Sequence, residues 1–200
     1  MNNVPVHFTV MINIGLALIP FVLAVVLFRW SKSRNVLWWL GTIVFVLFLP
    51  NSAYTLTDII HYIAAIQSPD ISISQLVFIY TPLYILYMLF CFECYVLSVQ
   101  WSFQYIKTQH WKVLSKLYLP VILFLTAIGV YLGRFQRLES YDIIRNPLIV
   151  FKDLYVDLTH WPSLTIITAL FIGFAISYRF FTYFNHIVLL KINSDKSLAS

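Results

Sequence analysis

Residues 8–28 read FTVMINIGLALIPFVLAVVLF, an almost wholly apolar run that contains one Asn and stops at Arg29. A helix of about 20 apolar residues covers the roughly 30 Å hydrocarbon core of a bilayer. The run therefore predicts a membrane-spanning helix. It is long for a signal peptide, no basic segment precedes it and no small-residue cleavage pattern follows it, so we expect this helix to be uncleaved.

The composition extends this prediction to the whole chain. Of the 200 residues, 60% are hydrophobic and 10% are charged, and the mean hydropathy is +0.82. Soluble domains carry charge on about a quarter of their residues, so a soluble domain is excluded. The net charge of +5 comes from basic residues scattered between apolar runs, without a nucleic-acid-binding pattern. The expected partner is therefore the lipid bilayer and not a nucleic acid.

The second apolar run begins at Val36 and would be too short to span a bilayer if it ended at Leu49. It reaches a spanning length, about 33 Å at 1.5 Å per residue, only if it continues through Pro50 to Asp58. Because a proline removes a backbone hydrogen bond inside a helix, we expect a kinked or broken helix.

The hydropathy pattern as a whole predicts an all-α fold, a polytopic bundle with a single transmembrane domain over residues 1–192. Five spans are expected, at residues 8–28, 36–58, 76–101, 117–133 and 162–178. Residues 134–161 are too polar to span and form an interfacial segment, and residues 193–200 are expected to be a disordered cytoplasmic tail. Cys91 and Cys94 lie within the third run and are expected to be inert.

Within the interfacial segment, Asn146-Pro147 matches the start of a helix. Apolar residues then recur at helical spacing on one side, and polar residues take the other: Leu148, Phe151, Tyr155 and Leu158 against Lys152, Asp153 and Asp157. This pattern suits a helix that lies along the membrane surface, and it suits an ordinary packed loop helix equally well.

The basic residues predict the orientation in the membrane, because cytoplasmic loops carry an excess of Lys and Arg. With the N-terminus outside and the C-terminus in the cytoplasm, nine of the 13 basic residues face the cytoplasm and four face out. The nine are Arg29, Lys32, Arg34, Lys107, Lys112, Lys116, Arg179, Lys191 and Lys196, and the four are Arg134, Arg137, Arg145 and Lys152. We expect a multi-pass protein of the plasma membrane.

The densest polar sequence surrounds Pro50, where residues 49–61 read LPNSAYTLTDIIH. On a continuing helix, steps of three and four residues place four side chains on one face: Asn51, Tyr54, Asp58 and His61. Asp58 and His61 could ligate one metal ion, or Asp58 could orient His61 as a general base. The competing interpretation is a solvated Asp and His at a helix end near the outer interface, and no metal or other cofactor is assigned.

A second polar stretch, GRFQRLESYD at residues 133–142, leaves the fourth span on the same predicted side of the membrane. Arg134 and Arg137 could clamp a phosphate or a carboxylate, because a guanidinium presents paired donors in one plane. They could equally reach lipid head groups or pair with Glu139 and Asp142.

The same two stretches resemble the DUF1361 family of predicted bacterial membrane proteins. The resemblance rests on the pattern LPN-x-x-Y-x-x-TD at residues 49–58 and on G-R-F-x-R at residues 133–137, which an aromatic-Asp pair follows. The aromatic residue is Tyr141 here, where the family more often has Trp. The resemblance implies a membrane protein, and it implies no established activity, cofactor or partner.

Glu93 lies about two-thirds of the way through the third apolar run. An ionisable residue inside a span is a functional-site hypothesis by default, so Glu93 could relay a proton or a cation. The alternative is a protonated or hydrated side chain that forms a hydrogen bond with a neighbouring helix.

Together these features predict an integral membrane protein of unknown molecular function with an outward-facing polar site built from both motifs. The candidate catalytic residues are Asp58, His61 and Asp142, and the candidate binding residues are Asn51, Tyr54, Asp58, Arg134, Arg137 and Asp142. The alternatives are an enzyme acting on a lipid or glycan head group at the outer leaflet, a small-solute or ion transporter, and a scaffold whose outer loop contacts another protein. Five spans without an internal repeat are few for a transporter, which would then need a homo-oligomer.

Overall fold

Helices make up nearly all of the chain that the structure describes. The computed structural model describes residues 6–31, 33–66, 72–109, 111–136, 145 and 147–198. In these ranges it contains helices and no strand, so the predicted all-α fold is confirmed. The first half of the chain contains α1 (Val6–Ala24), the π-helical turn η1 (Val25–Trp30), α2 (Val36–Tyr54), the 3-10 turn η2 (Thr55–Asp58) and α3 (Ile59–Ile66). Next come α4 (Ile73–Gln75), the π-helical turn η3 (Leu76–Tyr80) and α5 (Thr81–Thr108). The last helices are α6 (Lys112–Phe135), α8 (Pro147–Thr159) and α9 (Trp161–Leu198).

Five helical segments are long and apolar enough to cross a membrane, which confirms the predicted number. They are Val10–Trp30, Val36–Asp58, Ile73–Thr108, Lys112–Phe135 and Trp161–Lys191. The last helix continues to Leu198. Residues 193–198 are therefore helical, whereas the sequence predicted a disordered tail from residue 193. The reason is local: no Gly or Pro follows Gly173, so no residue interrupts the helical hydrogen bonds.

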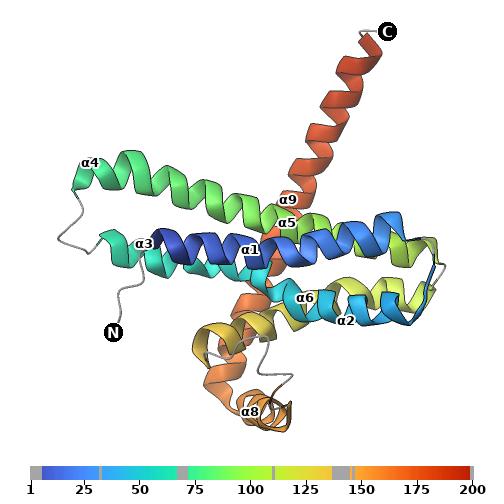
Figure 1. The fold of residues 1–200 in the computed structure, drawn as a ribbon, viewed down its shortest axis with the longest axis horizontal. Coiled ribbons are helices and arrows are strands. Elements are labelled where there is room, and N and C mark those ends of the chain that lie inside the picture. Colours follow the sequence, from blue (N-terminus) through green and yellow to red (C-terminus); the bar gives the residue numbers. More distant parts are fainter. Residues whose placement is uncertain are drawn as a thin grey trace.

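Four of these segments form the body of the bundle. Helix α1 packs on α2 and α5, and α6 also packs on α2 and α5 (Figure 1). Helix α9 packs on α6 and runs across the direction of the other four, so that its C-terminal half extends beyond them (Figure 1). Helix α8 packs beside the start of α9.

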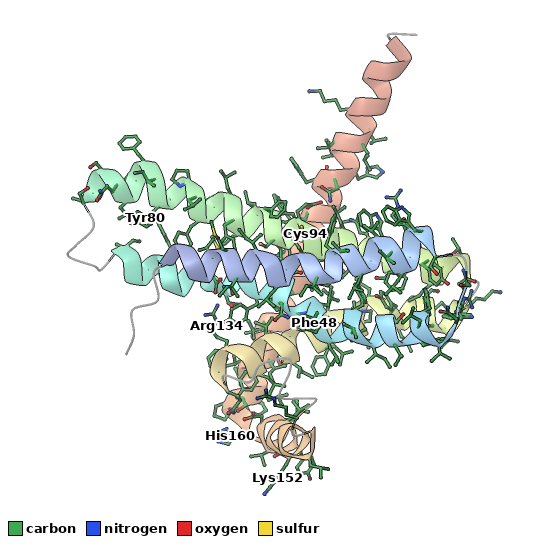
Figure 2. All side chains as sticks on the ribbon, viewed as in Figure 1. Phe48, Tyr80, Cys94, Arg134, Lys152 and His160 are labelled. Carbon is green, nitrogen blue, oxygen red and sulfur yellow. The ribbon has the colours of Figure 1, made fainter. Side chains whose placement is uncertain are left out.

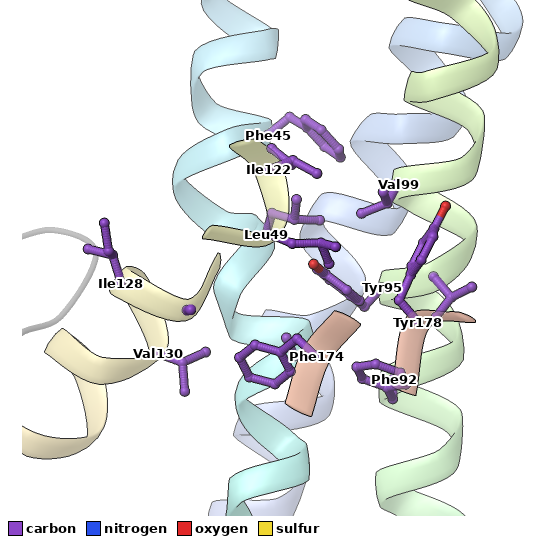
Figure 3. Close-up of a cluster of buried hydrophobic side chains, with 14 of the residues drawn as sticks. Phe45, Leu49, Phe92, Tyr95, Val99, Ile122, Ile128, Val130, Phe174 and Tyr178 are labelled. Atoms are coloured by element: carbon purple, nitrogen blue, oxygen red, sulfur yellow. The ribbon is translucent and has the colours of Figure 1, made fainter. Parts of the chain in front are cut away.

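The buried apolar core lies where α2, α5, α6 and α9 meet. Its side chains include Phe45, Leu49, Phe92, Tyr95, Val99, Ile122, Val130, Phe174 and Tyr178 (Figure 3). The hydroxyl group of the fully buried Tyr95 donates to Thr126 Oγ1 at 3.2 Å, so this polar atom keeps a partner. The core therefore joins α9 to the body of the bundle.

Helix α2 passes through Pro50 without a break. The α-helix continues to Tyr54 and only then tightens into η2. Ser52, two residues after Pro50, donates from Oγ to the carbonyl oxygen of Ala17 in α1 at 2.7 Å and ties the two helices together. A 3-10 turn advances about 120° per residue instead of about 100°, so η2 turns Asp58 away from the face that it would occupy on a continuous α-helix.

Helix α8 does not direct its predicted polar side outward throughout. Leu148 and Tyr155, from the predicted apolar side, are 83% and 71% exposed, whereas Asp157, from the predicted polar side, is 7% exposed. Asp157 therefore does not lie on an exposed polar side of α8, as a helix along the membrane surface would require. The physical reason is that buried donors on α6 and α9 surround Asp157, while the exposed apolar side chains suit a lipid environment.

Candidate functional site

Asp58, the last residue of η2, lies where four of the helices meet. Its side chain is 3% exposed, and the Arg134 guanidinium of α6 lies 2.6 Å from its Oδ1 atom. Tyr87 Oη of α5 and Asn13 Nδ2 of α1 donate to Asp58 Oδ2 at 2.7 Å and 3.0 Å. Burying a carboxylate is strongly unfavourable unless it is paired and hydrogen-bonded. These three donors therefore explain why an Asp is tolerated at this buried position.

Two threonine hydroxyl groups accompany the tightened turn that carries Asp58. Thr55 Oγ1 donates to the carbonyl oxygen of Ser52 at 2.9 Å, and Thr57 Oγ1 donates to that of Tyr54 at 2.6 Å. Such local bonds from hydroxyl groups to the backbone compete with α-helical pairing. They also fix Thr57 Oγ1 in place as an acceptor for a neighbouring side chain.

That neighbour is Arg134, which projects from the last turn of α6 (Figure 2). Its Nε and Nη2 atoms donate to Thr57 Oγ1 at 3.2 Å and 2.8 Å. Its Cζ atom lies 4.0 Å from the centre of the Tyr54 ring, within the range of a cation–π contact. A cation also suits the negative end of the α6 dipole. The side chain is 12% exposed, so Arg134 is held in one orientation and still reaches the surface.

The structure thus brings the two sequence motifs together at three of the candidate residues: Tyr54, Asp58 and Arg134. Asn51 lies on α2 one turn before Tyr54 and is half-buried. His61 lies in α3, but its side chain is outside the described part of the chain, and so are the whole of Arg137 and Asp142.

Sequence reasoning did not select Asn13, Tyr87 or Thr57. Asn13 is the one amide in the first apolar run, so a polar residue at spanning depth was the signal that could have found it. Tyr87 gave no signal, because tyrosines are frequent in this chain. Its role follows only from the contact between α5 and η2.

Glu93 is separate from these residues. Asn185 Nδ2 of α9 donates to Glu93 Oε1 at 2.6 Å, which joins α5 to α9. The two neighbouring cysteines, Cys91 and Cys94, are buried and free. The hydrogen bond from Asn185 is what a neighbouring helix offers to a polar side chain in a span.

A second carboxylate, Asp157, is also enclosed by donors. Tyr131 Oη and Ser163 Oγ lie 3.2 Å from Asp157 Oδ1, and Gln136 Nε2 donates to Oδ2 at 2.9 Å. His160 Nδ1 lies 3.5 Å from Ser163 Oγ. Sequence reasoning placed Asp157 on a helix within the interfacial segment, residues 134–161, but gave it no role.

Metal ligation was one prediction for Asp58 and His61. Among the residues that the structure describes, no three or more His, Cys, Asp or Glu side chains gather as a metal-binding group. The partners of Asp58 in the described network are instead an arginine, an amide and a phenol.

Comparison with known proteins gives a family and no closer relative. A family model described as "Protein of unknown function (DUF1361)" matches residues 12–178, which include both polar motifs and all the side chains of the Asp58 network. No curated protein and no solved structure matches the chain. Because the family model covers most of its length, this chain, an integral membrane protein with five potential spans, belongs to the DUF1361 family.

Proposed function

We propose that this integral membrane protein binds an anionic head group at the residues Tyr54, Thr57, Asp58 and Arg134, here called the Arg134 site. One observation carries the proposal: the guanidinium of Arg134 is held by Thr57 and Asp58, yet its side chain is more exposed than that of Asp58, at 12% against 3%. A guanidinium offers paired N–H donors that match a phosphate or a carboxylate. A side chain that is already ordered loses little conformational entropy on binding.

The position of the site supports a head group as the ligand. Asp58 is the last residue of the segment Val36–Asp58, and Arg134 is the last residue but one of Lys112–Phe135. Ends of spans lie at the depth of the lipid head groups. The nine-to-four distribution of basic residues supports the outer leaflet of the plasma membrane as the side on which this end of the bundle lies.

An enzyme acting on a lipid or glycan head group is the second candidate. The contact between Asp58 and Arg134 favours it, because an arginine stabilises developing negative charge while a carboxylate accepts a proton. Asp58, however, already accepts from Tyr87 and Asn13 and is almost fully buried, so a substrate reaches it only if one of these donors moves. Binding therefore needs less rearrangement than proton transfer at Asp58. His61 and Asp142 would be further proton-transfer groups.

A small-solute or ion transporter is the third candidate, and Glu93 is the residue that favours it. The bond between Glu93 and Asn185 joins α5 to α9, so breaking it would free one contact of the helix that crosses the bundle. With five spans, we expect such a transporter to act as a homo-oligomer.

The test is a binding experiment on the full-length protein in neutral detergent. Short-chain phosphatidylglycerol, the zwitterionic phosphatidylcholine and glycerol 1-phosphate are titrated while the melting temperature is measured. Phosphatidylglycerol is expected to raise the melting temperature saturably. Arg134→Lys should remove this rise, because a lysine keeps the charge beside Asp58 but cannot present paired donors.

Arg29→Lys is the matched control, since Arg29 is also an arginine over an aromatic ring, that of Trp101, at 5.1 Å. This control should respond as the wild type does. An equal response of Arg134→Lys and wild type would show that the proposal is wrong. Lipid turnover detected by mass spectrometry would support the enzyme instead, and solute flux in proteoliposomes that disappears in Asp58→Asn would support the transporter.

A further inference from the structure

Asp157 is a buried carboxylate that the Arg134 site does not use. It is 7% exposed, and its three partners, Tyr131, Gln136 and Ser163, are all uncharged. Within the described part of the chain no basic side chain forms an ion pair with it. The cost of burying an ionised carboxylate is therefore offset by neutral dipoles, in contrast to Asp58, which has an arginine.

Three described basic side chains, one on α6, one on α8 and one just before α9, are directed elsewhere. Arg134 of α6 is bound to Asp58. Lys152 of α8 is exposed and points away from the bundle (Figure 2). His160 is exposed and meets Ser163, not the carboxylate, in the described contacts. The negative charge of Asp157 is thus left without a cation from the described residues.

The spacing of the oxygens around Asp157 differs from that of a strong hydrogen bond. Both the Tyr131 and the Ser163 hydroxyl oxygens lie 3.2 Å from Asp157 Oδ1. The phenol oxygen of Tyr87 lies 2.7 Å from Asp58 Oδ2 in the same molecule, close to the usual length for a hydroxyl group on a carboxylate. Oxygens that share one cation at about 2.4 Å, at right angles to each other, lie about 3.4 Å apart. The 3.2 Å spacing at Asp157 lies within hydrogen-bond range, as it does between Tyr95 and Thr126, and it is also compatible with oxygens that share a cation.

Two helices also end at this point. Helix α6 ends at Phe135, directly before Gln136, and α8 ends at Thr159, two residues after Asp157. The C-terminal end of a helix carries partial negative charge, and such ends contribute to cation sites in membrane proteins. The N-terminal end of α9, at Trp161, offsets part of this potential, which leaves two negative ends against one positive end.

We propose that Asp157, Tyr131, Gln136 and Ser163, here called the Asp157 site, bind one monovalent cation such as Na⁺. One carboxylate charge balances one positive charge, and oxygen is the ligand that hard cations prefer. The hydroxyl groups of Tyr131 and Ser163 present lone pairs once their protons turn outward. The amide of Gln136 presents its oxygen after a half-turn, since the two orientations of an amide occupy the same space. This site is independent of the head-group proposal.

The test uses the full-length protein in neutral detergent, at fixed pH and fixed ionic strength, with NaCl exchanged against choline chloride. At about ten times the dissociation constant, Na⁺ is expected to raise the melting temperature by about 3–6 °C, saturably. Asp157→Asn should abolish the rise, and Ser163→Ala and Tyr131→Phe should shift the half-saturating Na⁺ concentration upward. Thr165→Ala is the matched control, because it removes an exposed hydroxyl group from the same turn of α9.

Two outcomes would overturn the proposal. The first is a melting temperature that is the same in NaCl and in choline chloride, or a Na⁺ effect of equal size in wild type and Asp157→Asn. The second is a stability that changes with pH but not with Na⁺, which would show that Asp157 binds a proton and not a metal cation. If Asp157→Asn fails to fold, binding of ²²Na⁺ to the wild type can be measured directly. A wild type that binds no ²²Na⁺ would contradict the proposal without the need for any variant.

Discussion

Gly129 of α6 lies against the ring of Pro50 of α2, so closely that a Cβ atom at Gly129 would stand 2.5 Å from Pro50 Cγ and 2.8 Å from Pro50 Cβ. Neither a proline ring nor the helix that carries it moves aside easily. We therefore expect Gly129→Ala to separate α6 from α2 and to destabilise the protein by about 1–3 kcal/mol. Thermal unfolding in detergent measures this as a loss of about 2–4 °C per kcal/mol.

Two other glycines provide controls for this prediction. A Cβ atom at Gly173 meets nothing within 4 Å, so Gly173→Ala should leave the melting temperature unchanged or slightly raised. A Cβ atom at Gly41 meets the flexible end of Leu27 at 2.9 Å, so Gly41→Ala should cost less than Gly129→Ala. If Gly129→Ala and Gly173→Ala melted alike, the close contact at Pro50 would not exist.

The ion pair between Asp58 and Arg134 should be strongly coupled. Asp58→Asn keeps the shape of the side chain but leaves the guanidinium without its anion, at a cost of about 3–5 kcal/mol. The double variant Asp58→Asn with Arg134→Gln should lose less than the sum of the two single variants, because it leaves no unpaired charge. A double-mutant cycle on the free energy of unfolding measures this coupling. Strictly additive losses would show that the two side chains do not interact.

The Glu93 side chain should contribute to stability through its acceptor oxygen and not through its charge. Glu93→Gln retains an oxygen for the amide of Asn185, so we expect little change in stability. Glu93→Leu leaves that amide without its acceptor and should cost about 0.6–1.7 kcal/mol. Unfolding of both variants checks this. Equal damage by Gln and Leu would show that the carboxylate itself is required, which would favour the transporter candidate.

The predicted orientation can be tested with single cysteines in a background in which the buried Cys91 and Cys94 are replaced by alanine. Ser72, before α4, is exposed, and Ser115, in the first turn of α6, is partly exposed. An impermeant maleimide on intact cells should label Ser72→Cys, while Ser115→Cys should be labelled only after the membrane is permeabilised. The reverse pattern would place the Arg134 site at the inner leaflet.

The sequence by itself determined the class of fold and the number of spans. Whether a segment crosses a bilayer depends on its length and its hydropathy, which are local properties, so runs such as residues 8–28 identify spans without any knowledge of their neighbours. The prediction ended α9 too early for a related reason. Hydropathy detects only the apolar part of a helix, so it gives no sign that the helix continues into a polar sequence. The two polar motifs were visible in the sequence because polar residues are rare in this chain.

Only the tertiary structure decided which polar side chains meet. Asn13 and Asp58 are separated by 45 positions, and Arg134 lies 76 positions beyond Asp58. Pairs so far apart depend on which faces of the helices pack together, and η2 alters one of these faces by changing the rotation per residue after Tyr54. The burial of Asp157 has the same origin, because donors on α6 and α9 surround it only after those helices have packed. Hydropathy selects the segments that enter the membrane, and helix packing selects the contacts between them.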